Sequence, residues 1–276
     1  MNETTIQMNL ELGEILSGMG RVMVAFSGGV DSALVLKRAQ EELGDQVLAV
    51  VVASELFRKQ EFEDAVKLAE DMGVAVYKTE IKELDNPDIV ANTPESWYHS
   101  KKMLYTHLNE LAERMDYPYV LDGMIMDDLD DFRPGMRARK EAGARSVLQE
   151  AKIYKKEVRE LANQLGLTVW DKPASCSLAS RIPYGIEIDK QKIEQVDQAE
   201  IFLAKIGFPH VRVRHHDNVA RIEVTPEEIT KLVEQRDSIH LKLKSLGFTY
   251  VSLDLRGYRT GSMNEELPES VLEASV

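Results

Sequence analysis

The segment Val22-Met-Val-Ala-Phe-Ser-Gly-Gly-Val-Asp-Ser32 predicts a buried strand, a tight turn and the start of a helix. Its first five residues are apolar, and residues 33–39 continue with a helical pattern. The two glycines of the turn allow the backbone to approach a ligand closely. Because free N–H groups and the positive end of the helix dipole would meet there, we expect an anion site, with phosphate as the usual ligand.

Side chains suited to a nucleotide accompany this turn. Ser27 and Ser32 offer hydroxyl groups to phosphate, and Asp31 offers a carboxylate to the Mg²⁺ ion of a nucleotide. We therefore predict that a nucleotide binds at Ser27, Gly28, Gly29, Asp31 and Ser32. The chain has neither G-x-x-x-x-G-K-S/T nor G-x-G-x-x-G after a strand, which excludes the two better-known phosphate loops. An ordinary glycine-rich turn is the plain alternative.

Composition and charge limit the classes of partner. The 276 residues are 43% hydrophobic and 29% charged, and the net charge is −13. An acidic total disfavours a nucleic-acid partner, because contacts with nucleic-acid phosphates need a basic surface. A small anionic substrate held by a few arginines fits better. The single cysteine, Cys176, excludes an intramolecular disulfide and a metal site built from several cysteines.

The sequence also carries signals about location. No apolar run approaches the roughly 20 residues that span a bilayer. The first residues, Met1-Asn-Glu-Thr-Thr5, are acidic and polar where a signal peptide would be basic. We expect a cytoplasmic protein.

Strands and helices alternate along the first part of the chain. We expect strands at 21–26, 46–53, 74–79 and 119–123, and helices at 7–19, 31–43, 58–72, 94–115 and 155–165. This order predicts an α/β fold with a doubly wound parallel sheet, in which ligands bind at the carboxyl ends of the strands. Ser54 and Gly123 follow two of these strands and are expected near an adenosine. Asp127 and Asp128 either serve a metal ion or belong to a solvated acidic loop that extends to Asp131.

The pattern changes after an irregular region at 167–186, whose prolines and glycine indicate a domain boundary. Beyond it we expect a helix at 189–206, a hairpin of 210–215 and 219–224, a helix at 226–246 and a strand at 249–254. These elements predict a smaller C-terminal α+β domain. We therefore predict a nucleotide-binding domain at 1–186 and a substrate or oligomerisation domain at 187–276.

The cysteine and two arginines are candidates for chemistry. Cys176 lies in a polar loop with Lys172 and Arg181 nearby, a setting that favours the reactive thiolate, although a silent free thiol is the alternative. Arg212 and Arg214 lie two residues apart and project from the same face of their strand. Such a pair suits bidentate recognition of phosphate or carboxylate, or it balances acidic neighbours at the surface.

Further short strings accompany the turn at 27–32: Ser54-Glu-Leu-Phe57, Thr93-Pro-Glu-Ser-Trp97-Tyr98, Leu121-Asp-Gly-Met124, Glu141-Ala-Gly-Ala-Arg145-Ser146, Ala174-Ser-Cys176-Ser177, Ser180-Arg181, Pro183-Tyr-Gly185, Val211-Arg-Val-Arg214, Leu253-Asp-Leu255 and Gly257-Tyr-Arg259. The string at 27–32 resembles the PP-loop of the ATP pyrophosphatase superfamily, which has an adenine nucleotide alpha hydrolase-like fold. Over nearly its whole length the chain resembles the LarE family of ATP-dependent sacrificial sulfur transferases.

Members of this family make the nickel-pincer nucleotide cofactor of lactate racemase by sulfurating pyridinium-3,5-biscarboxylic acid mononucleotide. The resemblance implies that the protein uses ATP and Mg²⁺ to adenylate a substrate carboxylate, that the Cys176 thiolate displaces AMP, and that elimination leaves a thiocarboxylate on the substrate and dehydroalanine at position 176. Each molecule would act once. The resemblance also implies a homo-oligomer, with a hexamer as the expected form.

The same resemblance implies roles for particular residues. Candidates to surround the substrate are Trp97, Ser180, Arg181, Arg212, Arg214 and Arg259, with the arginines on its phosphate. The catalytic candidates are Cys176, Asp31, Ser180 and Arg181. Besides Asp31, Glu200 and Glu223 match positions implied in metal binding, but Lys231 stands where an aspartate is expected.

Three other functions are open from the sequence. A tRNA thiolase would commonly use two cysteines or a cluster and would need a basic surface for RNA. A synthetase that amidates an adenylated substrate would leave Cys176 unchanged. A non-enzymatic sensor of adenine nucleotides would release no pyrophosphate in response to a carboxylate substrate.

Overall fold

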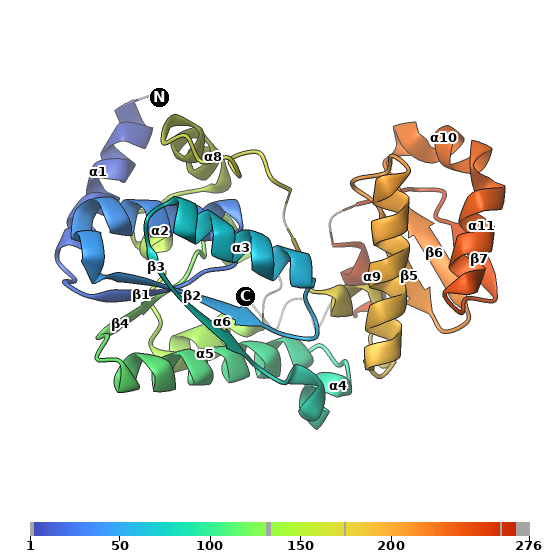
Figure 1. Ribbon diagram of the computed structural model, residues 1–276, viewed down its shortest axis with the longest axis horizontal. Helices are drawn as coiled ribbons and strands as arrows, with labels where there is room; N and C mark the ends of the chain where they lie inside the picture. Colours follow the sequence, from blue (N-terminus) through green and yellow to red (C-terminus); the bar gives the residue numbers. More distant parts are fainter. Residues whose placement is uncertain (1–2, 131–133, 174, 260, 269–276) are drawn as a thin grey trace. The chain divides into compact units, whose positions relative to one another are not determined.

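A computed structural model describes residues 3–130, 134–173, 175–259 and 261–268 (Figure 1). Within these residues the chain divides into two compact units. The first runs to Lys82 and resumes over Trp97–Ser175, and the second comprises Glu83–Ser96 and the chain from Cys176 onward. The division therefore lies directly before the single cysteine, eleven residues ahead of the boundary expected from sequence after residue 186. The 1–186 and 187–276 domains remain a prediction.

The first unit contains a parallel sheet of four strands, as the alternating sequence pattern predicted. The strands are β1 (Val22–Ala25), β2 (Val47–Ala53), β3 (Ala75–Glu80) and β4 (Tyr119–Leu121), in the order β3-β2-β1-β4. In the register, Val24 of β1 lies between Ala49 of β2 and Leu121 of β4. The α/β class and the parallel sheet are confirmed.

Helices cover both faces of this sheet (Figure 1). They are α1 (Glu3–Ser17), α2 (Val30–Leu43), α3 (Lys59–Asp71), α7 (Val147–Glu150) and α8 (Lys155–Gln164) on one face, and α5 (Ser96–Arg114) and α6 (Gly135–Ala142) on the other. Side chains alternate along each strand, so Val24 packs in the core under α2 while Met23 packs in the core over α5. The central strands read as continuously apolar because both faces are buried.

The second unit is built on a smaller mixed sheet. Its elements are α4 (Pro87–Val90), α9 (Lys190–Lys205), β5 (Arg212–His216), β6 (Val219–Glu223), α10 (Ile229–Glu234), α11 (Arg236–Ser245) and β7 (Tyr250–Leu253). β5 and β6 form the expected antiparallel hairpin, and β7 joins β6 in parallel. The helix expected at 226–246 is divided at Gln235, and Thr225 forms a capping box with Glu228 at its start.

No helix in the part of the chain that the structure describes combines the length and apolar character needed to span a membrane.

Candidate active site

The predicted phosphate loop joins β1 to α2 in the first unit (Figure 1). The Ser32 hydroxyl donates to the Gly29 carbonyl at 3.2 Å and accepts the N–H of Ser27 at 3.3 Å. The two serine hydroxyls lie 3.1 Å apart. Since the N-cap residue Gly29 has no side chain to cap α2, the positive end of the helix dipole faces the loop and can receive an anion.

Two glycines allow the backbone to pack tightly around this loop. Gly28 has a φ of +70°, and a Cβ there would lie 2.8 Å from the Cβ of Ala65 in α3. At Gly123, just after β4, a Cβ would lie 2.7 Å from the backbone nitrogen of Ser32. A side chain at either position would therefore fill space beside the loop. The resulting cradle fits a phosphate-bearing ligand, and Asp31 supplies a carboxylate of the kind that Mg²⁺ prefers.

Asp31 is paired with Lys155, a residue that no sequence motif marks. Lys155 begins α8, and its Nζ lies 2.6 Å from each carboxylate oxygen of Asp31. Burial raises the pKa of Asp31, while the charge of Lys155 acts in the opposite direction. Because the ammonium group has three donors and the carboxylate uses two, Lys155 is also able to contact a phosphate bound in the loop.

Ser54, Asp127 and Asp128 stabilise turns at the carboxyl ends of strands. The Ser54 hydroxyl accepts an N–H within the turn that follows β2, at 3.1 Å. Asp127 accepts the N–H of Lys155 at 2.8 Å, and Asp128 accepts an N–H of its own loop at 2.9 Å. These two carboxylates hold the loop and the start of α8, and Asp131 lies outside the described residues.

Trp97 follows a segment that is anchored in the second unit. The side-chain amide of Asn92 donates to the carbonyl oxygens of Ile182, Pro183 and Ile186 at 2.8 to 3.1 Å. The half-buried Trp97 comes five residues later, in the first turn of α5. The backbone that leads to Trp97 is thus fixed by the chain that follows Cys176.

Arg181 holds the loop that carries Cys176. The cysteine is exposed, whereas the side chain of Arg181 is only 3% exposed. Its Nη1 donates to the Ser180 hydroxyl at 2.8 Å, to the carbonyl oxygen of Ser177 at 3.2 Å and to that of Cys176 at 3.4 Å. Its Nε and Nη2 donate to the two carboxylate oxygens of Glu200 at 2.9 and 3.0 Å. Arg181 therefore ties the cysteine loop to α9.

Two of the other predicted arginines already have carboxylate partners. Nη2 of Arg214 donates to Glu223 at 2.7 Å, and Nη1 donates to the carbonyl oxygen of Ser180 at 2.8 Å. Arg259 forms two hydrogen bonds with Glu265, of 2.5 and 2.7 Å. These contacts use much of the hydrogen-bonding capacity that would be needed to bind a substrate phosphate.

Arg212 differs from the other arginines of the site. Its Nη1 donates to the adjacent Val211 carbonyl at 2.9 Å, and its guanidinium lies 5.2 Å from the ring centroid of Tyr258. Burial lowers the pKa of Arg212, with Arg181 acting in the same direction and Cys176 in the opposite one. Since we find no ion pair of Arg212 with any described carboxylate, it retains donors for an anion.

The predicted metal ligands Glu200 and Glu223 face arginines. Glu200 pairs with Arg181, and Glu223 pairs with Arg214. Lys231 donates to a backbone carbonyl at 2.9 Å. Among the residues with described positions, no group of three or more His, Cys, Asp or Glu side chains is placed to hold a metal ion. Metal binding at Asp31, Glu200 and Glu223 remains a prediction.

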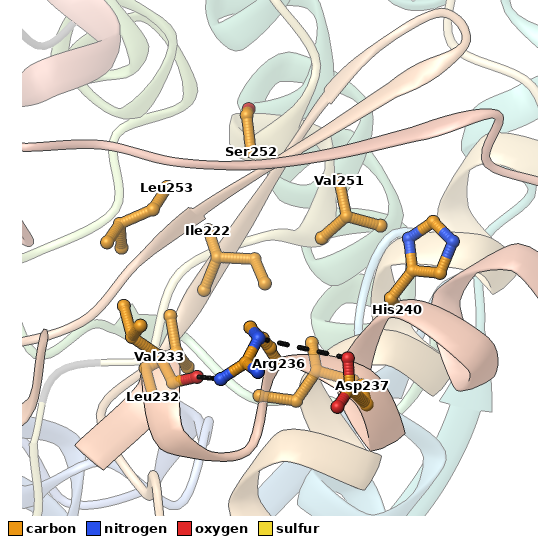
Figure 2. Close-up of a pocket in the computed structure, with 10 residues that line it drawn as sticks. Ile222, Leu232, Val233, Arg236, Asp237, His240, Val251, Ser252 and Leu253 are labelled. Atoms are coloured by element: carbon orange, nitrogen blue, oxygen red, sulfur yellow. Dashed lines mark hydrogen bonds and ion pairs between the residues drawn. The ribbon is translucent and has the colours of Figure 1, made fainter. Parts of the chain in front are cut away.

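A separate cavity of about 310 Å³ lies in the second unit, lined by residues of β6, β7, α10 and α11 (Figure 2). Its apolar lining includes Ile222, Val251 and Leu253, and Arg236 points toward Asp237 at its edge. None of the residues predicted for the active site lines this cavity.

Comparison with known proteins gives both a domain family and full-length relatives. Residues 11–115 match the NAD synthase family. The chain is 51% identical to the pyridinium-3,5-bisthiocarboxylic acid mononucleotide synthase of Lactiplantibacillus plantarum, over 93% of this chain and 94% of that protein. It is 42% identical to an uncharacterized protein of Synechocystis, over 93% of this chain and 96% of the relative. It is also 27% identical to the glutamine-hydrolyzing GMP synthase of Oceanobacillus iheyensis, over 73% of this chain and 43% of that protein.

Proposed function

Because the chain belongs to the LarE family of ATP-dependent sacrificial sulfur transferases, we propose that it adenylates the carboxylates of pyridinium-3,5-biscarboxylic acid mononucleotide, each protein molecule giving the sulfur of its Cys176 to one of them. This reaction is a sulfur-transfer step in the biosynthesis of the nickel-pincer nucleotide cofactor of lactate racemase. The observation that carries the proposal for this chain is the exposed Cys176, whose carbonyl oxygen accepts a hydrogen bond from Arg181, in a protein that also has a phosphate loop at Ser27–Ser32.

The phosphate loop performs the adenylation half of the reaction. Ser27, Ser32 and the N–H groups at the start of α2 bind the phosphates of ATP. Asp31 would hold Mg²⁺, which when bound screens the phosphate charge and orients the α-phosphate for attack. An oxygen of the substrate carboxylate attacks the α-phosphorus, and the bond to the bridging oxygen breaks with its electron pair leaving on pyrophosphate. Lys155 balances charge beside Asp31 during this step.

The cysteine loop performs the transfer half. The Cys176 thiolate attacks the acyl carbon of the adenylate, and AMP leaves with the electron pair of the broken C–O bond. Arg212 is the arginine we assign to the substrate phosphate, with Trp97, Ser180, Arg214 and Arg259 as further groups around the substrate. The product of this step is a thioester between Cys176 and the substrate, which elimination then resolves into a thiocarboxylate and dehydroalanine.

We propose ATP and Mg²⁺ as the cofactors, on the basis of the phosphate cradle and the Asp31 carboxylate. We propose a cytoplasmic location, where ATP is available. We also propose a homo-oligomer, with a hexamer as the expected form.

Release of pyrophosphate tests the enzymatic part of this proposal. With ATP and Mg²⁺, the protein should release pyrophosphate when the dicarboxylate mononucleotide is added, and release should depend on that addition because the substrate carboxylate is the nucleophile. The measurement is a coupled pyrophosphate assay, with nicotinamide mononucleotide, which has no ring carboxylate, as the control that should release none. ATP binding without any substrate-dependent release would identify the protein as a nucleotide sensor instead.

A further inference from the structure

Release of sulfur from the protein requires loss of the proton on the Cα of Cys176. This proton is only weakly acidic, because the negative charge left behind spreads onto one atom, the carbonyl oxygen of the same residue. A fixed cation or hydrogen-bond donor aimed at that oxygen stabilises the charge and lowers the barrier. The elimination step therefore needs a donor at the Cys176 carbonyl in addition to a reactive thiol.

Arg181 supplies a donor at this place. Its Nη1 donates to the carbonyl oxygen of Cys176 at 3.4 Å, and the same nitrogen reaches the carbonyl of Ser177 at 3.2 Å. The guanidinium is almost completely buried, so its field is weakly screened by water. Charge on the Cys176 oxygen would strengthen and shorten this contact, because hydrogen bonds to charged acceptors are shorter than neutral ones.

Glu200 fixes the direction in which Arg181 acts. Its two oxygens bind Nε and Nη2 on one edge of the guanidinium, at 2.9 and 3.0 Å. Because the guanidinium is planar and its fork is rigid, this bidentate contact turns Nη1 toward the cysteine loop. Glu200 itself is held by the N–H of Val213 at 2.9 Å. The arginine is thus pre-organised before any charge develops, which is the condition for electrostatic catalysis.

Resting on the function proposed above, we propose that Arg181 is a catalytic residue of the elimination step, stabilising the negative charge that develops on the carbonyl oxygen of Cys176. Hydroxide from solvent, which can reach the exposed Cys176, takes the Cα proton and becomes water. The electron pair of the C–H bond forms the Cα=Cβ double bond. The Cβ–S bond breaks, and its electron pair leaves with the sulfur as the substrate thiocarboxylate.

The test is the fate of the thioester in Arg181→Lys, followed by intact mass at successive times after mixing the full-length protein with ATP, Mg²⁺ and the dicarboxylate mononucleotide. A lysine keeps the positive charge beside Glu200 but cannot bridge the carboxylate and the loop carbonyl with a rigid fork. We expect the heavier thioester adduct to accumulate and the dehydroalanine form to appear about 10²-fold more slowly, the usual effect of removing one oxyanion donor.

Two further variants complete the design. Arg181→Met combined with Glu200→Gln removes both buried charges and keeps an acceptor for the Val213 N–H, so it tests the same effect if the single variant folds poorly. Arg236→Lys is the control, because Arg236 is ion-paired in the same unit with Asp237 and lines a cavity that contains none of the predicted site residues. It should form dehydroalanine at the wild-type rate.

The outcomes separate this inference from the function on which it rests. Elimination at the wild-type rate in Arg181→Lys and in the double variant would overturn the catalytic role. An equal slowing of adduct formation and elimination would also overturn it, because it would show that Arg181 only holds the loop. If the wild-type protein makes the sulfurated product with Cys176 intact, the proposed function itself fails.

Discussion

Replacing Glu200 with alanine should lower the free energy of unfolding by about 3–5 kcal/mol, the usual result of removing one partner of a buried ion pair. Glu200 and Arg181 are 2% and 3% exposed. Without the carboxylate, the guanidinium stays buried with an uncompensated charge, and the N–H of Val213 loses its acceptor. Thermal and urea unfolding should show the loss, with a fall in melting temperature of roughly 10 °C.

Glu194→Ala is the matched control for this substitution. Glu194 lies on the same helix, α9, but its ion pair with Lys190 is exposed, so its loss should cost at most about 0.5 kcal/mol. The comparison also tests Glu200 as a metal ligand. A wild-type protein whose melting temperature falls on addition of EDTA, together with a Glu200→Ala variant that no longer responds to EDTA, would show that a metal ion and not Arg181 is the main partner of Glu200.

Replacing Gly28 with alanine should weaken ATP binding at least tenfold. Gly28 has a left-handed backbone conformation, which costs a residue with a Cβ about 1–2 kcal/mol of conformational energy. The new Cβ would also lie 2.8 Å from the Cβ of Ala65 and 3.0 Å from its Cα. Relief of this overlap moves the loop away from α3 and distorts the phosphate cradle. Because a tenfold loss of affinity needs only about 1.4 kcal/mol, we expect calorimetry to show at least that loss.

Gly20→Ala separates backbone strain from the overlap. Gly20 also has a positive φ, of +76°, but no atom lies within 4 Å of the position of its Cβ. This variant should lose some stability and bind ATP like the wild type. If Gly28→Ala bound ATP with wild-type affinity, the loop would not have to pack against α3 in order to hold phosphate.

The sheet and the phosphate loop could be predicted because their signals are local. Apolar runs with intervening helical patterns specify a parallel sheet covered on both faces, and two glycines before a helix specify the turn. The break at Gln235 had no such signal, since neither glycine nor proline occurs in 229–245. The segment 83–96 groups with the second unit, and Asn92 within it bonds to partners about 90 residues later in the chain.

The roles of the charged residues could not be predicted from the sequence, because their partners lie far away along the chain. Lys155 contacts Asp31 across 124 residues, and no spacing rule connects two positions so far apart. The sequence resemblance places Arg181, Arg212 and Arg214 alike around the substrate phosphate, with Arg181 also as a catalytic candidate. Only the folded chain shows that Arg181 and Arg214 are bound to buried glutamates, whereas Arg212 keeps donors for a ligand.

The intact mass of the wild-type protein, before and after incubation with ATP, Mg²⁺ and the dicarboxylate mononucleotide, tests most directly whether Cys176 gives up its sulfur. Loss of the mass of one H₂S, located at position 176 by peptide mapping and absent in Cys176→Ser, is the predicted result. An unchanged Cys176 in a reaction that releases pyrophosphate and forms product would contradict the account and would indicate an external sulfur or nitrogen donor.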